Sequence, residues 1–272
     1  MDWILLAKYF ILGLIQGISE PIPISSSGHL ILAQNLFGLG LDDLSFEVVV
    51  NTASLLAVIL VYRKDIIRLI SSTMQYLRKR EASTKDVKDD FKLVIYLIIG
   101  TIPAGLLGVL FNDFIGEHLK STFTVGIALL VTAFFLFFIR NLKGTKGRHA
   151  MTWKEALLIG IGQAVALTPG VSRSGATVVT AMLIGMKRDT ALMFSFLLYI
   201  PVSLGASVLE IPDMLQKDFS NDLLIAYALA FIASLVASFF ALKWFIDVMK
   251  KGKLVYFAIY CLVIAIITLF LL

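Results

Sequence analysis

The chain has 272 residues, of which 58% are hydrophobic, and carries a formal net charge of +5 and one cysteine. A soluble domain with so little polar surface would not stay dispersed in water, so the composition excludes an ordinary soluble globular protein. The lone Cys261 lies inside an apolar run, which excludes a disulfide framework and a metal-thiolate cluster.

The first segment, residues 3–37, is apolar but interrupted by a polar motif. Residues 1–8 lead into it without a small-residue cleavage site, so we do not expect a cleavable signal peptide. Pro21 and Pro23 break the helix that precedes them, and a second helix is expected to start near His29. The segment therefore reads as a helical hairpin that enters and leaves a membrane on one face.

Six later apolar runs are long enough to cross a hydrocarbon layer of about 30 Å as helices. They are residues 46–62, 93–111, 122–139, 190–209, 223–242 and 254–272. A second interrupted segment, residues 155–186, lies between the third and fourth runs and contains Pro169 and Gly170. Since lipid cannot satisfy non-helical backbone, we expect the two interrupted segments to face each other inside the protein.

Basic and acidic connectors alternate along the chain. Of the 24 lysines and arginines, 20 fall in residues 63–92, 140–154, 187–188 and 243–253, whereas residues 42–47, 113–120 and 210–222 hold nine acidic residues. The positive-inside rule places the basic connectors in the cytoplasm, and lipid headgroups explain the basic excess better than nucleic acid does. The charged run 78–92 is expected to be a solvated loop.

The two halves of the chain resemble each other at an offset of 147 residues. The matching positions are Gln16 and Gln163, Ile24 and Val171, Ser25 and Ser172, Ser27 and Ser174, and Gly28 and Gly175. Each half reads as a hairpin followed by three spans, and three is an odd number, so the second copy would be inverted. Chance similarity between two turns rich in glycine and serine is the alternative.

We therefore predict an all-α polytopic membrane protein that forms a single membrane domain over residues 1–272. It would contain two inverted-topology repeats, about 1–140 and 150–272, each made of a re-entrant helix hairpin and three transmembrane helices. This gives six spans and two re-entrant hairpins around a central site.

The first polar motif, residues 16–29, reads QGISEPIPISSSGH. Gln16 and Glu20 are four residues apart and so project from one face of a helix. The serines that follow lead into a helix N-terminus, whose unpaired N–H groups suit a phosphate. Ser26 supplies a hydroxyl and a candidate nucleophile, and His29 can act as an acid or base near neutral pH.

The second polar motif, residues 169–175, reads PGVSRSG and again leads into a helix start. A guanidinium at membrane depth is costly unless it meets an anion, and the planar fork of Arg173 fits phosphate oxygens. The sequence predicts that Glu20, Ser26, His29 and Arg173 converge on one cavity as catalytic residues. The phosphate-binding candidates are Ser25, Ser27, Gly28, Ser172, Ser174 and Gly175.

Each of these residues also has a structural interpretation. Arg173 could form a buried ion pair with Glu20 and bind no ligand, and at least one of the serines must cap a helix. Gln16 and Gln163 could simply hydrogen-bond between helices, and Asn51 in the first span is equally open.

At these residues the chain resembles the bacitracin-resistance family of undecaprenyl-diphosphate phosphatases. The resemblance covers essentially the whole chain and rests on QxxxE with PxSSSGH at 16–29, PGxSRSG at 169–175 and FSFLLYIP at 194–201. It implies a membrane hydrolase that removes the terminal phosphate of undecaprenyl diphosphate at the outer face of the cytoplasmic membrane. This reaction recycles the lipid carrier for peptidoglycan and other envelope glycans.

The resemblance also implies a divalent cation, Mg²⁺ or Ca²⁺, and places the family's acidic pair on Gln16 and Glu20 as metal ligands. Its serine, histidine and arginine fall on Ser26, His29 and Arg173. Two positions depart from the usual pattern: Gln16 stands where many members have Glu, and Asn51 where His or Gln is more frequent. These departures leave the metal charge and the contribution of the first span open.

The hypothesis is that Ser26 or a water attacks the terminal phosphorus, while His29 and Glu20 share the proton and metal work. A lipid-phosphate flippase or transporter is the alternative, since inverted repeats and broken helices are also transporter features. A carrier, however, has no need of a base beside a hydroxyl. A structural scaffold would leave Arg173 without a purpose. The partners expected are the lipid substrate and membrane lipids, with a homodimer left open.

Overall fold

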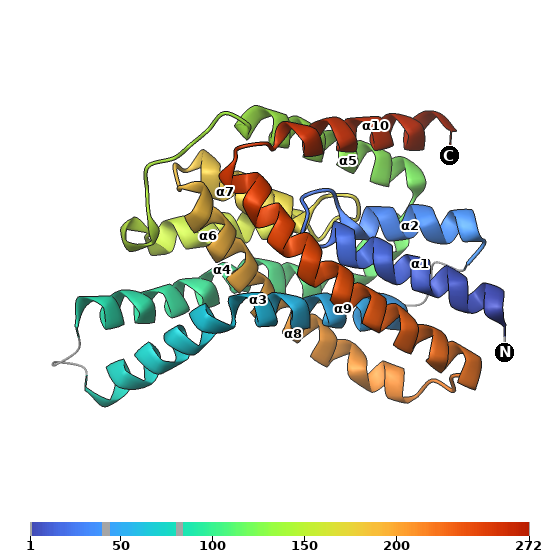
Figure 1. The fold of residues 1–272 in the computed structure, drawn as a ribbon, viewed down its shortest axis with the longest axis horizontal. Helices are drawn as coiled ribbons and strands as arrows, with labels where there is room; N and C mark the ends of the chain where they lie inside the picture. The colour runs from blue at the N-terminus through green and yellow to red at the C-terminus, as the bar shows by residue number, and fades with distance from the viewer. Residues whose placement is uncertain (1, 40–43, 80–83, 272) are drawn as a thin grey trace.

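The computed structural model describes residues 2–39, 44–79 and 84–271, and in this part of the chain every regular element is helical (Figure 1). The elements in chain order are α1 (Trp3–Ser19), α2 (Ser26–Phe37), α3 (Leu44–Arg78), α4 (Lys85–His118), α5 (Thr122–Ile139), the 3₁₀ helix η1 (Arg148–Ala150), α6 (Trp153–Val165), α7 (Arg173–Leu183), α8 (Arg188–Leu215), α9 (Asn221–Lys250) and α10 (Val255–Leu271). An isolated β-bridge pairs Lys146 with Met186. The expected all-α class is confirmed.

Five of the helices in the described ranges are long and apolar enough to cross a membrane, namely α3, α4, α5, α8 and α9. The sixth expected span, residues 254–272, forms the apolar helix α10, but this helix has only 17 residues. At 1.5 Å per residue it is about 25 Å long, slightly short of a 30 Å hydrocarbon core. The helix packs along α5 at one edge of the molecule (Figure 1).

The basic segment 63–92 is more regular than the sequence suggested. Helix α3 continues to Arg78, and α4 begins at Lys85, so residues 85–92 are helical and the expected solvated loop is wrong there. Asp90 on α4 is buried and accepts hydrogen bonds from Ser72 (3.0 Å) and Arg148 (3.5 Å). A paired acidic side chain therefore ties α4 to α3 and to the connector before α6. Of the acidic connector 42–47, residues 42 and 43 lie outside the described residues.

Both interrupted segments form two helices separated by a turn. The N-cap serines of the second helices, Ser25 and Ser172, accept a hydrogen bond from the backbone N–H groups of Gly28 (3.2 Å) and Gly175 (3.1 Å). These caps satisfy N–H groups that a helix start would otherwise leave unpaired. Helices α1 and α2 lie beside each other, and Lys8 near the start of α1 reaches the carbonyl of Phe37 at the end of α2 (2.7 Å).

The start of α6 is fixed by Glu155, which is almost fully buried. Its carboxylate accepts hydrogen bonds from Lys146 Nζ (2.5 Å) and from the backbone N–H of Thr152 (2.7 Å). Burial by itself raises the pKa of Glu155, but these hydrogen bonds outweigh it and hold the pKa below its ordinary value. The ionised carboxylate therefore stabilises the fold above its unfolded pKa, and this contribution is lost as the pH falls through the folded pKa.

Close helix packing sets the position of α1, which ends at the first polar turn. A Cβ added at Gly13 would lie 2.4 Å from the carbonyl oxygen of Ala230, and one added at Gly17 would lie 2.5 Å from that of Ser234. Ala230 and Ser234 both belong to α9, so the backbones of α1 and α9 are in close contact at Gly13 and Gly17 (Figure 1). Small residues at such a spacing are typical of helix contacts in membranes.

Replacing Gly17 with valine is therefore expected to push α1 away from α9, because the added side chain has no room beside Ser234. We expect a loss of about 1–3 kcal/mol or more in stability and a fall in any activity that needs α1 in place. Thermal unfolding in detergent measures the first effect. Gly105→Val is the matched control, since nothing lies within 4 Å of a Cβ there. Equal unfolding temperatures for both variants would contradict the packing argument.

Candidate active site

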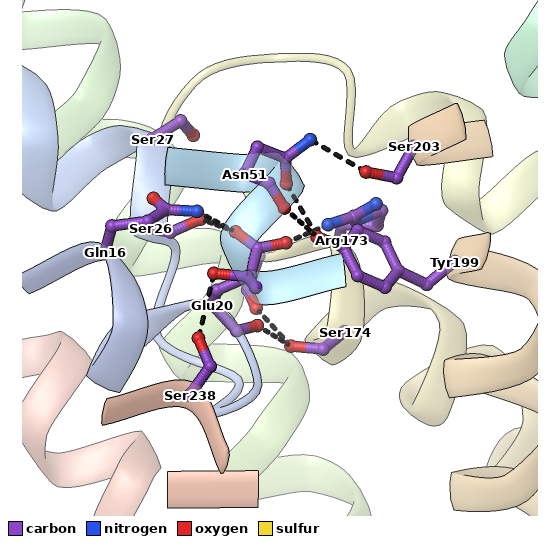
Figure 2. Close-up of polar contacts among 12 residues, drawn as sticks. Gln16, Glu20, Ser26, Ser27, Asn51, Arg173, Ser174, Tyr199, Ser203 and Ser238 are labelled. Carbon is purple, nitrogen blue, oxygen red and sulfur yellow. Dashed lines mark hydrogen bonds and ion pairs between the residues drawn. The ribbon is translucent and has the colours of Figure 1, made fainter. Parts of the chain in front are cut away.

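Glu20 is the centre of the polar cluster formed by the two turns (Figure 2). One carboxylate oxygen, Oε1, accepts a charge-assisted hydrogen bond from Nη2 of Arg173. The other, Oε2, accepts hydrogen bonds from the Ser26 hydroxyl and from Gln16 Nε2 (3.1 Å). The side chain of Glu20 is 9% exposed and that of Arg173 is 22% exposed, so the pair is largely removed from solvent.

Local structure explains how these side chains meet. Gln16 and Glu20 are one turn apart at the end of α1, on the same face. Ser26 is the first residue of α2 and Arg173 the first of α7, so each stands at a helix N-terminus beside the opposing turn. The sequence-based expectation that Glu20, Ser26 and Arg173 lie together agrees with this geometry.

The two turns touch directly. The backbone N–H of Gly170 donates to Ser27 Oγ (3.4 Å), and a Cβ added at Gly28 would lie 3.2 Å from the Cα of Gly170. Ser174 Oγ donates to the carbonyls of Glu20 (3.4 Å) and Ile22 (3.3 Å) in the first turn. Polar backbone in the middle of the molecule is therefore satisfied by the partner turn, as membrane burial requires.

The phosphate-binding candidates occupy two similar helix starts. Ser25 and Ser172 are the caps described above, and their hydroxyls lie 3.4 and 3.3 Å from those of Ser27 and Ser174. Ser25 adopts a positive φ of 71°, which is costly for a residue with a Cβ. The structural interpretation of these serines as helix caps therefore holds for Ser25 and Ser172. The first N–H groups of each helix have no intrahelical partner, which suits a phosphate.

His29 does not hydrogen-bond to the other expected catalytic residues. Its Nδ1 lies 2.7 Å from the carbonyl oxygen of Ser25, and its Nε2 lies 2.8 Å from the hydroxyl of Tyr260 on α10. The rings of His29 and Tyr260 are stacked, with centroids 5.6 Å apart. The expected convergence of four side chains is thus seen for three of them, because one His29 nitrogen faces the Ser25 carbonyl and the other faces Tyr260 on α10.

The sequence did not single out Tyr199, which covers the other side of Arg173. The guanidinium carbon of Arg173 lies 3.7 Å from the centroid of the Tyr199 ring, a cation–π contact. The Tyr199 hydroxyl donates to Oδ1 (2.7 Å) and to the carbonyl oxygen (3.1 Å) of Asn51 on α3. Asn51 in turn donates to Ser203 on α8 (2.9 Å), as Figure 2 shows. Asn51, left open by the sequence, therefore supports the aromatic face on which Arg173 rests.

This support can be tested by stepwise removal. Tyr199→Phe keeps the ring and loses the hydrogen bonds to Asn51, so a fall of about fivefold in the rate of phosphate release is expected, the worth of one net hydrogen bond. Tyr199→Leu also removes the cation–π contact, and a further tenfold fall is expected. Steady-state kinetics in detergent measures both. Equal activities for the two variants would show that the ring contact has no role.

The metal implied by the family resemblance has a limited set of ligands here. The described residues contain no group of three or more His, Cys, Asp and Glu side chains able to hold an ion. In the described cluster Glu20 offers the only carboxylate, and Gln16, whose Nε2 donates to it, is the neutral member of the expected pair. Since Mg²⁺ often keeps its waters and binds one carboxylate together with substrate phosphates, these residues fit a cation delivered with a phosphate substrate.

The space around the cluster is small. A cavity of about 10 Å³ is lined by Glu20, Arg173, Ser174 and Tyr199, among others. This volume holds roughly one water, so a phosphate would need Glu20 or Arg173 to move. The arrangement can supply a cation, hydroxyl donors and a carboxylate that accepts a proton from Ser26.

Comparison with known proteins assigns the chain to one family. Residues 9–267 match the family described as "Bacitracin resistance protein BacA". Undecaprenyl-diphosphatase 2 of Bacillus thuringiensis (strain Al Hakam) is 53% identical over 262 residues, which cover 96% of each chain. The undecaprenyl-diphosphatase of Oceanobacillus iheyensis is 53% identical over 97% of this chain and 96% of its own. Undecaprenyl-diphosphatase 1 of Bacillus licheniformis is 50% identical over 99% of both.

The matches run from near the start of α1 to near the end of α10, so they include both polar turns and all five long apolar helices. Together, the helices and the relatives identify a multi-pass membrane protein. The chain belongs to the bacitracin resistance protein BacA family.

Proposed function

We propose that this chain hydrolyses undecaprenyl diphosphate to undecaprenyl phosphate and inorganic phosphate, and so returns the lipid carrier to envelope glycan synthesis. The observation that carries the proposal is the buried Glu20–Arg173 pair with the Ser26 hydroxyl on the same carboxylate, in a chain about half identical to proteins named undecaprenyl-diphosphatase. A phosphate needs a cation and donors, and its hydrolysis also needs a base.

In the proposed reaction the terminal phosphate replaces the carboxylate of Glu20 as the partner of Arg173. Ser26 Oγ attacks the terminal phosphorus, its proton passes to Glu20, and the bond from that phosphorus to the bridging oxygen breaks. Undecaprenyl phosphate leaves, and a water then hydrolyses the phosphoserine to release inorganic phosphate and restore Ser26. Direct attack by water with Glu20 as the base is the other route, and trapping a phosphoenzyme at Ser26 separates the two.

Within this scheme Arg173 and the N–H groups at the starts of α2 and α7 offset the charge on the equatorial oxygens. Glu20, rather than His29, is placed to take the Ser26 proton, since only Glu20 is hydrogen-bonded to that hydroxyl. For His29 to take part in proton transfer, its ring would first have to leave Tyr260. A divalent cation, Mg²⁺ or Ca²⁺, when bound with the substrate phosphates to Glu20 and Gln16, would supply further neutralisation of phosphate charge.

We also propose that the two helix pairs are re-entrant hairpins in two inverted repeats, about 1–140 and 150–272. The offset of 147 residues supports this beyond the motifs, because it also relates Gly13 to Gly160. Each of these glycines faces the backbone of a helix in the other half: a Cβ added at Gly13 would lie 2.4 Å from the carbonyl oxygen of Ala230 on α9, and one added at Gly160 would lie 2.3 Å from that of Gly100 on α4. In both repeats, then, the first hairpin helix packs closely through a glycine.

The protein is proposed to lie in the cytoplasmic membrane with its basic connectors inside and the site open to the outer face. The charge alternation along the chain supports this orientation. Single cysteines placed in residues 140–154 and 216–220 of a Cys261→Ser background, and labelled in intact cells by an impermeant thiol reagent, test it. Labelling of 216–220 but not of 140–154 is expected. The opposite result would show that the orientation is the reverse of the one proposed.

Phosphate release from undecaprenyl diphosphate by the purified protein, with and without a chelator, tests the activity itself. Release that depends on Mg²⁺ or Ca²⁺ is expected. The absence of release with either ion, together with movement of lipid phosphate across reconstituted vesicles, would instead point to the flippase alternative. In the described residues no contact favours that alternative over hydrolysis.

A further inference from the structure

An apolar groove runs from the lipid-facing surface to the second polar turn. It lies between α5, α6 and α7 and encloses about 190 Å³. Its rim includes Phe135, Val165 and Leu183, which are 41%, 59% and 45% exposed, whereas Leu136 and Val179 in its floor are buried. The groove is therefore open to the bilayer on one side and closed by packed side chains on the other.

The hydroxyl groups along this groove are already engaged within the protein. Thr180 donates to the carbonyl of Ala176 (2.8 Å), and Thr132 accepts from the backbone N–H of Ser172 (3.4 Å). The walls consequently offer hydrocarbon surface and no unsatisfied polar side chain among those that carry hydroxyls. An apolar ligand therefore leaves no wall hydroxyl without a hydrogen bond, and a polar ligand finds no free hydroxyl to bind.

One end of the groove reaches the second polar turn, although the groove shares no lining residue with the cavity beside Glu20 and Arg173. Ser172 and Gly175 line this end of the groove. Arg173, which binds Glu20, lies between them in the sequence. Ser172 Oγ also lies 3.3 Å from Ser174 Oγ, which donates to the Glu20 carbonyl. The backbone of the second polar turn thus separates the guanidinium of Arg173 from the apolar groove. A ligand with a charged end and an apolar tail matches this juxtaposition.

We propose that this groove holds the isoprenyl units nearest the diphosphate, while the rest of the chain extends into the bilayer. The proposal rests on the proposed function, which supplies the lipid diphosphate. A cavity of roughly 150 Å³ can hold a benzene molecule, so a groove of about 190 Å³ has room for one or two five-carbon units. The substrate would then be bound at two adjacent parts, by Arg173 at the phosphate and by α5, α6 and α7 along the first isoprenyl units.

A second apolar depression, lined by Ile98, Gly105 and Pro201 among others, lies on α4 and α8. None of its lining residues belongs to either polar turn, so it lacks the adjoining anion site. It therefore provides a matched control surface for substitutions of the same size.

Filling the groove with Ala176→Phe tests the proposal through chain length. In this variant kcat/KM for phosphate release from farnesyl diphosphate and undecaprenyl diphosphate should fall by about tenfold or more, mainly through KM, as expected when buried methylenes lose their contacts. Release from methyl diphosphate, which has no isoprene unit, should stay within about twofold of wild type because no part of it reaches the groove. Gly105→Phe should change neither. An equal fall for long and short substrates in Ala176→Phe, repeated in the rim variant Leu183→Trp, would overturn the proposal.

A second measurement does not need turnover. A photoreactive prenyl diphosphate with its reactive group on the second isoprene unit should label α5, α6 or α7, and excess undecaprenyl phosphate should prevent the labelling. Labelling of α4 or α8 would overturn the groove assignment. Labelling that excess undecaprenyl phosphate does not reduce would also overturn it, because the groove would then bind any membrane lipid. Absence of phosphate release from every substrate by the wild-type protein would instead reject the proposed function, and labelling would still decide the groove.

Discussion

Arg173→Ala is expected to lower kcat/KM for phosphate release by roughly 10²–10³-fold, the loss seen when a preorganised group that stabilises transition-state charge is removed. Arg173 is the only lysine or arginine in the two polar motifs, 16–29 and 169–175. It is held between the Glu20 carboxylate and the ring of Tyr199, so its position is set before a substrate arrives. Phosphate release by the purified variant measures the effect.

Arg173→Lys is the matched comparison. It keeps the charge but loses the planar fork that donates two parallel hydrogen bonds to a phosphate, so an intermediate activity is expected. Both variants should elute as folded protein from a sizing column in detergent, which separates a chemical defect from misfolding. Wild-type turnover by folded Arg173→Ala would remove the anion-binding role and with it the central step of the proposed reaction.

Glu20→Ala is expected to abolish phosphate release and also to destabilise the protein by about 3–5 kcal/mol, the cost of leaving one partner of a buried ion pair alone. The carboxylate accepts hydrogen bonds from Arg173, Ser26 and Gln16, and alanine replaces none of them. Unfolding by denaturant in detergent micelles measures the stability, and phosphate release measures the activity.

Glu20→Gln distinguishes the two roles of this residue. The amide keeps the shape and one acceptor oxygen, so the variant should be more stable than Glu20→Ala. It cannot take a proton from Ser26, so its activity should be as low. An active Glu20→Gln would exclude Glu20 as the base and return that role to His29. A Glu20→Ala variant as stable as wild type would show that the ion pair contributes nothing to the fold.

The sequence alone was sufficient for the helical class, the membrane setting and the pairing of the two polar turns. These follow from local rules: hydropathy over about 20 residues, charge in the connectors, and the spacing of Gln16 and Glu20 on one helix face. Arg173 could be assigned an anionic partner in advance, because an unpaired guanidinium inside a membrane is too costly to persist. Glu20 is that partner in the structure.

Only the tertiary structure decided which way His29 points, what lies over Arg173 and where an apolar tail would fit. His29 is only three residues from Ser26, but its ring points to Tyr260, which lies 231 residues further along the chain. Tyr199 belongs to the motif FSFLLYIP, but the motif does not indicate the contact with Arg173, which arises because α8 packs beside α3 and α7. Such contacts depend on how helices are rotated against each other, and hydropathy and motif spacing carry no information on that rotation.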